Sequence, residues 1–199
     1  MRSRGASDVE FVQRVKCVVV GNDSVGKTSL LTAYTTGFLP VGHTPTIFEQ
    51  YSAKVIVDGE LVHLDVSDTA GEECFSDIRA LSYTNTDVFV VCYSVVDLKS
   101  FESVVTTWIP ELRYHSPQCR VVIVGMKIDL RETALENGVP MVTKKQGAKM
   151  AKDMKAQYLE CSVMQNSGLM DVFEMAARVA LKTKEPNYKM RACCMCSLI

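Results

Sequence analysis

One eight-residue stretch, Gly21-Asn22-Asp23-Ser24-Val25-Gly26-Lys27-Thr28, combines residue types and a spacing suited to binding phosphate. It fits the pattern G-x-x-x-x-G-K-[ST], a loop whose backbone N–H groups surround phosphate oxygens. The Lys27 ammonium can reach the outer phosphates of a nucleotide, and the Thr28 hydroxyl can ligate Mg²⁺. Because an apolar run over residues 15–20 precedes the loop, the stretch predicts a buried strand, a phosphate-binding turn and a helix.

Further short motifs after apolar runs can complete a nucleotide site. Asp68-Thr69-Ala70-Gly71 offers a carboxylate for a Mg²⁺-bound water and a glycine N–H for a terminal phosphate. In Met126-Lys127-Ile128-Asp129, the Asp129 carboxylate can accept from the N1–H and the exocyclic amine of guanine, a donor pair that adenine lacks. Glu160-Cys161-Ser162 can present a backbone N–H to guanine O6. Each motif is weak alone, and their order along one chain favours a guanine nucleotide.

Strand-like and helix-like segments alternate along the chain. Short Val-rich runs are typical of parallel strands covered on both faces, and they occupy residues 15–20, 88–93 and 121–125. Asp58-Gly59, between runs at 51–57 and 61–66, predicts a type I′ hairpin and therefore an antiparallel edge strand. We expect a doubly wound α/β domain whose six-stranded, mostly parallel sheet has helices on both faces and ligands at the carboxyl ends of its strands.

Two apolar stripes predict helices that cover this sheet. The first helix begins near Ser100, and its stripe comprises Phe101, Val104, Val105, Trp108, Ile109 and Leu112. The stripe of the last helix comprises Leu169, Val172, Phe173, Ala176 and Ala180. Because both stripes repeat at helical spacing, we expect them to be core faces rather than ligand sites.

Composition and charge narrow the class of protein. A chain of 199 residues is long enough for one domain with a substantial core. A formal net charge of -1 gives no overall field that would attract nucleic acid, and no apolar run approaches the span of a membrane helix. Scattered cysteines are expected to be reduced core residues. We expect an extension over residues 1–14, a nucleotide-binding domain over 15–183 and a flexible tail over 184–199.

Together, these motifs resemble the Ras superfamily of small GTPases and, within it, the Rho family, closest to its Rac-like branch. The likeness covers residues 15–179 and the last four residues. Thr44-Pro45-Thr46-Ile47-Phe48-Glu49-Gln50-Tyr51 is similar to the first switch, and Ile78-Arg79-Ala80-Leu81-Ser82-Tyr83 is similar to the sequence after the second switch. The resemblance implies a switch that binds GTP and GDP with Mg²⁺, hydrolyses GTP, and recruits effectors through residues 43–51 and 71–83.

The resemblance also implies roles for individual residues. Thr28 and Thr46 would ligate Mg²⁺, with Asp68 acting through water. Lys27, Gly71 and Glu72 would serve catalysis, and Phe48, Glu49 and Tyr51 would contact effectors. The implied nucleotide-binding set is Gly21, Asn22, Asp23, Ser24, Val25, Gly26, Lys27, Thr28, Ser29, Thr46, Asp68, Gly71, Lys127, Asp129, Ser162 and Val163.

Two residues depart from the family pattern at positions that govern hydrolysis. Asp23 replaces a glycine, and its carboxylate would crowd and repel both the γ-phosphate and the path of an activating protein's arginine. Glu72 replaces the glutamine that orients the attacking water. A carboxylate can accept a proton but cannot donate to a phosphate oxygen, so Glu72 either abolishes hydrolysis or supports it by another route. Asp23 favours slow hydrolysis that activating proteins do not stimulate.

Other departures concern nucleotide retention. Leu39 replaces an aromatic residue that packs on guanine, Met126 replaces a residue that braces the phosphate loop, and Val163 replaces a smaller alanine beside the base. These changes predict fast exchange unless neighbouring residues compensate for them. Fast exchange would make exchange factors dispensable, and with slow hydrolysis it predicts a switch biased toward its GTP form.

The C-terminal residues Cys196-Ser197-Leu198-Ile199 have the C-a-a-X form of a prenylation site, and the aliphatic last residue favours geranylgeranyl. A single lipid binds membranes only reversibly, so we expect Cys193 and Cys194 to be palmitoylated as a second anchor. A metal site built from these cysteines is the rival interpretation, but it lacks a fourth ligand at useful spacing. We expect a lipid-anchored monomer on the cytoplasmic face of the plasma membrane or of endomembranes.

Two other classes of protein fit parts of the sequence. A non-hydrolysing scaffold would bind GTP and act only by recruiting effectors. A P-loop kinase for small metabolites would share the phosphate loop, but it would have no use for Asp68-Thr69-Ala70-Gly71, for Lys127 and Asp129, or for the prenylation box.

Overall fold

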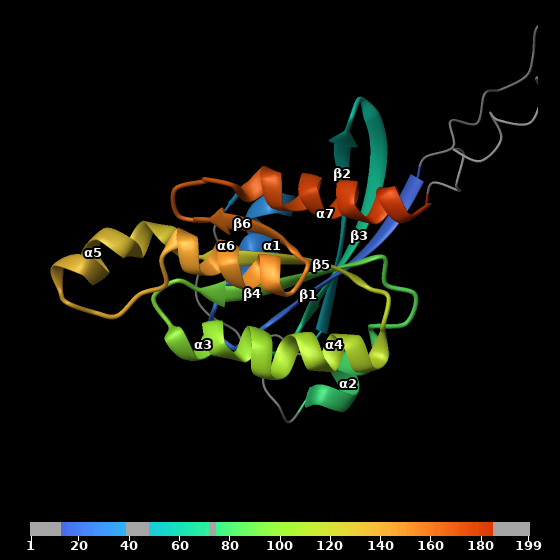
Figure 1. The fold of residues 1–199 in the computed structure, drawn as a ribbon. Coiled ribbons are helices and arrows are strands. Elements are labelled where there is room, and N and C mark those ends of the chain that lie inside the picture. The colour runs from blue at the N-terminus through green and yellow to red at the C-terminus, as the bar shows by residue number, and fades with distance from the viewer. Residues whose placement is uncertain (1–12, 39–47, 72–74, 185–199) are drawn as a thin grey trace, which may run out of the picture.

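The computed structural model describes residues 13–38, 48–71 and 75–184, which form a central sheet with helices on both faces (Figure 1). The strands are β1 (Gln13–Gly21), β2 (Phe48–Val57), β3 (Glu60–Thr69), β4 (Val88–Ser94), β5 (Arg120–Met126) and β6 (Gln157–Cys161). Their order is β2-β3-β1-β4-β5-β6. Among the pairings of these six described strands, only that of β2 with β3 is antiparallel. The predicted doubly wound sheet with one antiparallel edge strand is confirmed.

Helices form a layer on each face of this sheet (Figure 1). On one face lie α1 (Lys27–Thr36) and α7 (Leu169–Lys184), whose buried residues share a core with β1. A second core lies on the other face, beneath α3 (Leu98–Ser103), α4 (Ile109–His115) and α6 (Lys144–Asp153). Two short α-helices, α2 (Ser76–Leu81) and α5 (Arg131–Glu136), lie outside these layers' cores, and α5 stands out from the body of the domain.

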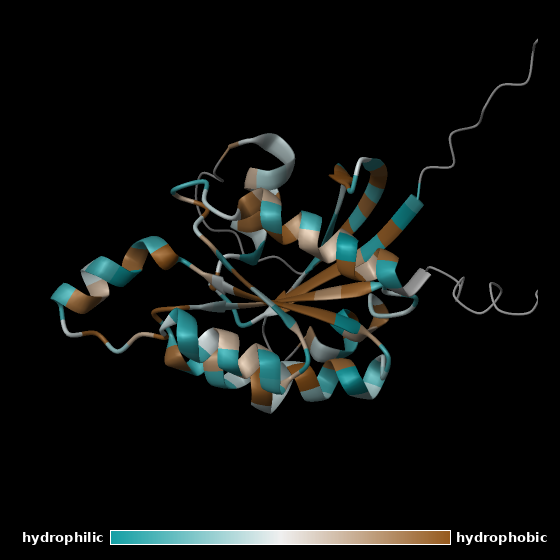
Figure 2. Cartoon of the chain, turned by 45° about the horizontal axis from the view of Figure 1, so that its top comes forward, coloured by the Kyte–Doolittle hydropathy of each residue, from teal (hydrophilic) through white to brown (hydrophobic). Residues whose placement is uncertain are grey.

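Strand β1 shows how the sequence builds both cores. Val15, Cys17 and Val19 point into the core under α1 and α7, whereas Val18 and Val20 point into the other core. This division follows from the two-residue period of a strand, which sends successive side chains to opposite faces. Figure 2 shows the same pattern for the whole sheet, since hydrophobic residues concentrate in the central strands while the helices carry mixed surfaces.

The β2–β3 hairpin turns at Asp58 and Gly59 with φ angles of 52° and 88°. Positive φ at both central residues is the signature of the predicted type I′ turn. The paired strands are longer than predicted, because β2 begins at Phe48 and β3 ends at Thr69. This extension carries the predicted effector residues of β2 alongside Asp68.

The helix predicted to begin near Ser100 begins earlier and is interrupted. Asp97 caps α3 by accepting a hydrogen bond from the Lys99 N–H, and a π-helical turn over Val104–Trp108 then joins α3 to α4. Because a π-helical turn holds more residues than an α-helical turn, the side chains of this segment do not follow the α-helical spacing assumed for the stripe. Val105 is 40% exposed, so its placement in the core was wrong, whereas the other residues of the stripe are buried or half-buried. The stripe of α7 is buried as predicted.

The described cysteines fit the expectation of reduced core residues. Cys17, Cys92 and Cys161 are buried, Cys119 is half-buried, and all four are free thiols. Burial raises the pKa of Cys17 to about 12, so its thiol stays protonated at neutral pH. In the part of the chain that the structure describes, no helix is long and apolar enough to cross a membrane.

An ion pair between Arg131 and Glu160 ties the start of α5 to β6 and makes stability sensitive to acid. The carboxylate accepts from both Arg131 Nη atoms, at 2.6 and 2.8 Å, and from the Tyr158 hydroxyl. Burial alone would raise the pKa of Glu160, but these hydrogen bonds outweigh burial and hold it below its ordinary value of 4.5. The stabilisation is therefore complete above that pH and is lost as pH falls through the lower folded value.

Replacement of Glu160 by glutamine should remove this dependence on pH, because the amide does not titrate. Between about pH 5 and pH 3, we expect the Glu160→Gln variant to lose less unfolding free energy than the unmodified chain. Urea unfolding at several pH values measures the difference. Glu136→Gln, a change at an exposed position of α5, is the control and should follow the unmodified chain. Parallel curves for the Glu160→Gln variant and the unmodified chain would contradict the prediction.

Candidate nucleotide-binding site

The phosphate loop joins β1 to α1 at the carboxyl edge of the sheet, where ligands were expected. Gly21 has φ of 144°, and a Cβ there would lie 2.2 Å from the Cys92 carbonyl oxygen of β4. Gly26 has φ of 109° and begins α1 without a side-chain cap. The first N–H groups of α1 are therefore left to face a ligand, and the helix dipole favours an anion there.

Lys27 is held inside this loop. Its Nζ donates to the carbonyl oxygens of Gly21 and Asn22, at 2.9 Å each. The side chain is 6% exposed, and burial lowers the pKa of its ammonium, although the Asp68 carboxylate opposes that shift. A buried cation surrounded by backbone groups is suited to hold phosphate oxygens.

Thr28 and Asp68 form the part of the predicted magnesium site that the structure describes. The Thr28 hydroxyl donates to Asp68 Oδ2 at 2.7 Å. The other carboxylate oxygen, Oδ1, is buried and has no hydrogen-bond partner among the described residues, and burial raises the pKa of this group. A hydroxyl beside a carboxylate with an unused oxygen fits Mg²⁺, which prefers oxygen ligands and would offset the phosphate charge. The third predicted residue, Thr46, lies outside the described residues.

Gly71 lies directly against the phosphate loop. A Cβ on Gly71 would be 2.4 Å from the backbone nitrogen of Asp23 and 2.5 Å from the carbonyl carbon of Asn22. Only glycine fits this approach. The structure therefore places the predicted γ-phosphate contact next to Asp23, whose side chain is exposed and accepts a hydrogen bond from the Ser24 hydroxyl. Glu72 lies outside the described residues.

The base-binding segment supports the phosphate loop from the other side. Lys127 Nζ donates to the Ser24 carbonyl oxygen at 2.7 Å. The Met126 side chain is buried, and its Cε lies 3.6 Å from the position of a Cβ on Gly26. The loop is therefore braced despite the substitution at position 126, contrary to the expectation from residue type. Val163 packs its side chain against the core, which argues against displacement of the base.

Asp129 and Ser162 meet although they lie 33 positions apart in the sequence. The Ser162 hydroxyl donates to Asp129 Oδ1 at 2.5 Å and accepts from the Gln165 N–H. The Ser162 N–H already donates to the Ser167 carbonyl at 2.9 Å, so it is not the backbone N–H that this segment offers to guanine O6. Val163 N–H is left as the candidate donor, and Ser162 instead orients the carboxylate that would bind guanine.

This hydrogen bond can be tested by replacing Ser162 with alanine. Loss of a bond to a charged group costs about 1.5 kcal/mol, so GTP and GDP should bind about tenfold more weakly. Titration with a fluorescent guanine nucleotide measures the change. Ser167→Ala removes the exposed hydroxyl of a neighbouring serine and should leave affinity unchanged. Equal affinities for both variants would contradict the positioning role of Ser162.

The Ras family model matches residues 16–182, which include all the site residues described above. This chain belongs to the Ras family. Members of the Ras family are small GTP-binding switches with GTPase activity, and they bind GTP and GDP, typically with Mg²⁺. The match is to the Ras family as a whole and does not distinguish its branches, so the Rho-like, Rac-like character stays a prediction. Among the described residues, no cluster of three or more His, Cys, Asp or Glu side chains suits a metal ion.

A partly buried polar network that the sequence did not predict connects the phosphate loop of this Ras-family chain to α2. The Trp108 Nε1–H donates to Asn22 Oδ1 at 2.7 Å, and Asn22 Nδ2 donates to the Ser103 hydroxyl. The Arg79 guanidinium lies over the Trp108 ring, 4.7 Å from its centroid. Trp108 was assigned only to the core, yet it contacts the nucleotide loop and the helix that follows the second switch.

Glu111 fixes the other end of this network. Arg79 donates to its two carboxylate oxygens at 3.0 and 2.8 Å and to the Ala70 carbonyl at 3.0 Å. The Tyr83 hydroxyl donates to the same carboxylate at 2.6 Å. Burial alone would raise the pKa of Glu111, but the hydrogen bonds from Arg79 and Tyr83 outweigh it and lower that pKa. Arg79 thereby links Ala70, the residue before Gly71, to Glu111 of α4.

The predicted effector residues lie on β2, the edge strand of the sheet. Phe48 is 40% exposed, Glu49 is exposed, and Tyr51 is half-buried with its hydroxyl donating to Glu49. Glu49 pairs with Asp68 in the β2–β3 ladder. The exposed edge of β2 therefore lies next to the predicted magnesium site, and its contact with effectors stays a prediction.

Proposed function

We propose that this Ras-family chain is a Rho-like switch that is biased toward its GTP form by slow hydrolysis and recruits effectors at a membrane. The position of Asp23 carries the proposal. A Cβ on Gly71 would lie 2.4 Å from the Asp23 backbone nitrogen, which supports a γ-phosphate position bordered by both residues. The carboxylate at that position repels the phosphoryl group and obstructs the approach of an activating arginine.

Fast nucleotide exchange contributes less to the bias toward the GTP form than the substitutions at positions 39, 126 and 163 predict from residue type alone. Lys127 and Met126 both support the phosphate loop, so retention of the nucleotide does not depend on the replaced residue. Leu39 lies outside the described residues. We therefore attribute the bias mainly to hydrolysis.

Recruitment is proposed to use two parts of the chain. Phe48, Glu49 and Tyr51 would contact effectors along the exposed edge of β2. The tail would anchor the protein through a prenyl group on Cys196 and palmitoyl groups on Cys193 and Cys194, all of which lie outside the described residues. The active species is proposed to be a monomer that does not depend on exchange factors or activating proteins.

Replacement of Asp23 by glycine should accelerate hydrolysis. We expect single-turnover phosphate release from GTP-loaded protein in Mg²⁺ to rise about tenfold or more, which corresponds to about 1.4 kcal/mol of barrier. Nucleotide retention measured in the same sample separates hydrolysis from loss of GTP. Asp23→Asn keeps the size of the side chain without its charge and should give an intermediate rate.

The result distinguishes three cases. Faster release from Asp23→Gly than from the unmodified chain supports a switch held back by Asp23. Phosphate release at an ordinary small-GTPase rate from both proteins would mean that Asp23 does not control turnover. No release from either would favour the non-hydrolysing scaffold, with Glu72 as the cause.

A further inference from the structure

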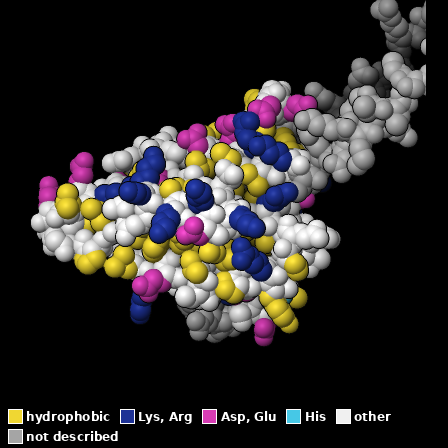
Figure 3. Space-filling model, viewed as in Figure 1, with side chains coloured by type: hydrophobic (Ala, Val, Ile, Leu, Met, Phe, Trp, Pro, Cys, Tyr) yellow, Lys and Arg dark blue, Asp and Glu magenta, His cyan; other side chains and the backbone are white. Residues whose placement is uncertain are grey.

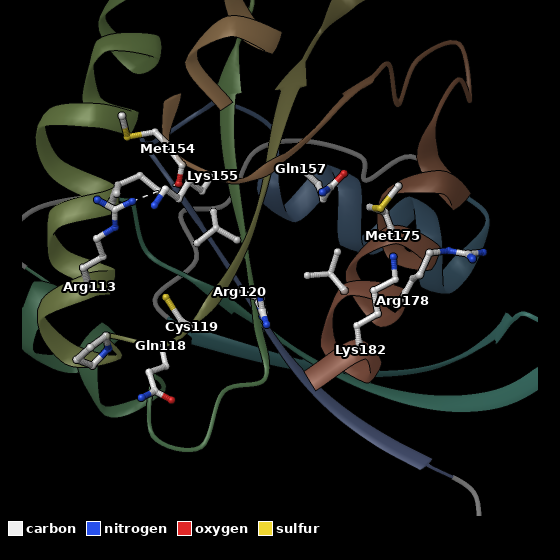
Figure 4. A pocket seen from close by; sticks show the side chains of 14 residues that line it. Arg113, Gln118, Cys119, Arg120, Met154, Lys155, Gln157, Met175, Arg178 and Lys182 are labelled. Atoms are coloured by element: carbon white, nitrogen blue, oxygen red, sulfur yellow. Dashed lines mark hydrogen bonds between the residues drawn. The ribbon is translucent and has the colours of Figure 1, made fainter. Parts of the chain in front are cut away.

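A cavity of about 540 Å³ lies at the end of the domain opposite the phosphate loop. It is bordered by α4 and the turn after it, the start of β5, the turn before β6 and α7 (Figure 4). Parallel strands carry the nucleotide site at their carboxyl ends, whereas this cavity lies where β5 and β6 begin. It is therefore separate from the GTP site and has no part in the switch described above.

The lining of this cavity is strongly basic. Five cationic side chains and no carboxylate contribute to it, and the cations are Arg113, Arg120, Lys155, Arg178 and Lys182. In Figure 4, Arg178 and Lys182 extend from α7 on one side, Arg113 and Lys155 lie on the other, and Arg120 lies between them. Figure 3 shows basic side chains spread over the face formed by α4, α6 and α7, with acidic ones mostly at its edges.

Among the residues that the structure describes, most of these cations have no counterion. Arg178 pairs with Asp58 and Glu174 at 2.6 Å each. In the described part of the chain, the other four have no carboxylate within 4.0 Å, although Arg113 donates to the Met154 carbonyl at 3.2 Å. The formal net charge of the whole chain is only -1. Such a local concentration of like charge favours a ligand that carries several negative charges.

The remaining lining residues indicate that the ligand also has an apolar portion. Apolar side chains share the cavity with the cations, and they include Val121, Met154, Met175 and Val179. A ligand with phosphates beside a hydrocarbon portion matches this mixture better than a free inorganic ion does. Cys196 lies 14 positions after Lys182, and that length of chain can span at most about 50 Å. The cavity is therefore within reach of the membrane to which a lipidated tail would bind.

We propose that this cavity binds the phosphorylated headgroup of an anionic membrane lipid. Arg120, Lys155 and Lys182 contact the phosphates, and the apolar wall accepts the adjoining glycerol and acyl portion. The proposal deepens the proposed membrane function and rests on it for location, but it is independent of GTP hydrolysis. Binding at this site would orient the domain with the end opposite the nucleotide toward the membrane and leave β2 open to effectors.

The test uses the full chain without lipidation, so that the tail contributes no anchor. Cosedimentation is measured with vesicles of phosphatidylcholine that contain about 5% phosphatidylinositol bisphosphate. The comparison vesicles contain enough phosphatidylserine, in place of the phosphoinositide, to carry the same total charge. The variant Arg120→Glu/Lys182→Glu should bind the phosphoinositide vesicles about tenfold or more weakly. The control variant Lys99→Glu/Lys145→Glu changes exposed lysines near helix N-termini outside the cavity, and it should bind as the unmodified chain does.

Each outcome supports or overturns the headgroup site. Selective binding to phosphoinositide vesicles that only the cavity variant loses supports it. Equal binding to both kinds of vesicle, equal loss in the control variant, or binding only to soluble inositol phosphate overturns it. Unchanged GDP affinity shows that the variants are folded. Binding of the prenylated chain to plain phosphatidylcholine vesicles tests the tail by itself, so failure of the cavity and failure of the membrane anchor are distinguishable.

Discussion

Replacement of Lys27 by alanine is expected to weaken binding of GTP and GDP by between about 30-fold and about 5,000-fold. The ammonium is buried in the phosphate loop with two backbone carbonyls as its present partners. Without it, the phosphates would lose a charge-assisted contact in a region shielded from solvent, and truncation of one partner of such a pair costs about 2–5 kcal/mol. Equilibrium titration with a fluorescent guanine nucleotide in Mg²⁺ measures the loss.

A matched control separates this effect from a general loss of charge or of folding. Lys145 is exposed at the start of α6, and Lys145→Ala should bind nucleotide as the unmodified chain does. Thermal unfolding without nucleotide shows whether the Lys27→Ala protein remains folded. A folded Lys27→Ala protein with less than threefold weaker binding would refute the assignment of the phosphate loop.

Replacement of Arg79 by alanine is expected to destabilise the domain by about 3–5 kcal/mol. The Arg79 side chain is only 2% exposed, and its removal leaves the Glu111 carboxylate and the Ala70 carbonyl without their guanidinium partner. It also removes the cation that lies over Trp108. For a domain of this size, such a loss corresponds to a Tm lower by about 6–20 °C.

Urea unfolding of the GDP-bound protein measures the change, and two variants identify its cause. Arg79→Lys keeps the charge but not the paired geometry, and it should fall between alanine and the unmodified chain. Combining Arg79→Ala with Glu111→Gln removes the uncompensated charge and should recover part of the loss. A loss below about 1 kcal/mol for Arg79→Ala would show that the network contributes little to stability.

Features encoded by neighbouring residues could be predicted from the sequence. The apolar runs predicted the central strands, Asp58-Gly59 predicted the type I′ turn, and the buried stripe of α7 matched its helical spacing. The phosphate loop followed from the order of its glycines, lysine and threonine. These features rest on local geometry, because backbone φ angles, strand alternation and helical period act over a few residues.

Tertiary structure decided which distant residues meet. Lys127 supports Ser24 across 103 positions, and Trp108 contacts Asn22 across 86. The π-helical turn that exposes Val105, the orienting role of Ser162 and the basic cavity also escaped prediction. Residue spacing carries no information about such contacts, because they depend on how strands and helices pack across the sheet. The sequence thus determined the elements and the phosphate chemistry, and packing determined how the loop is braced and linked to α2.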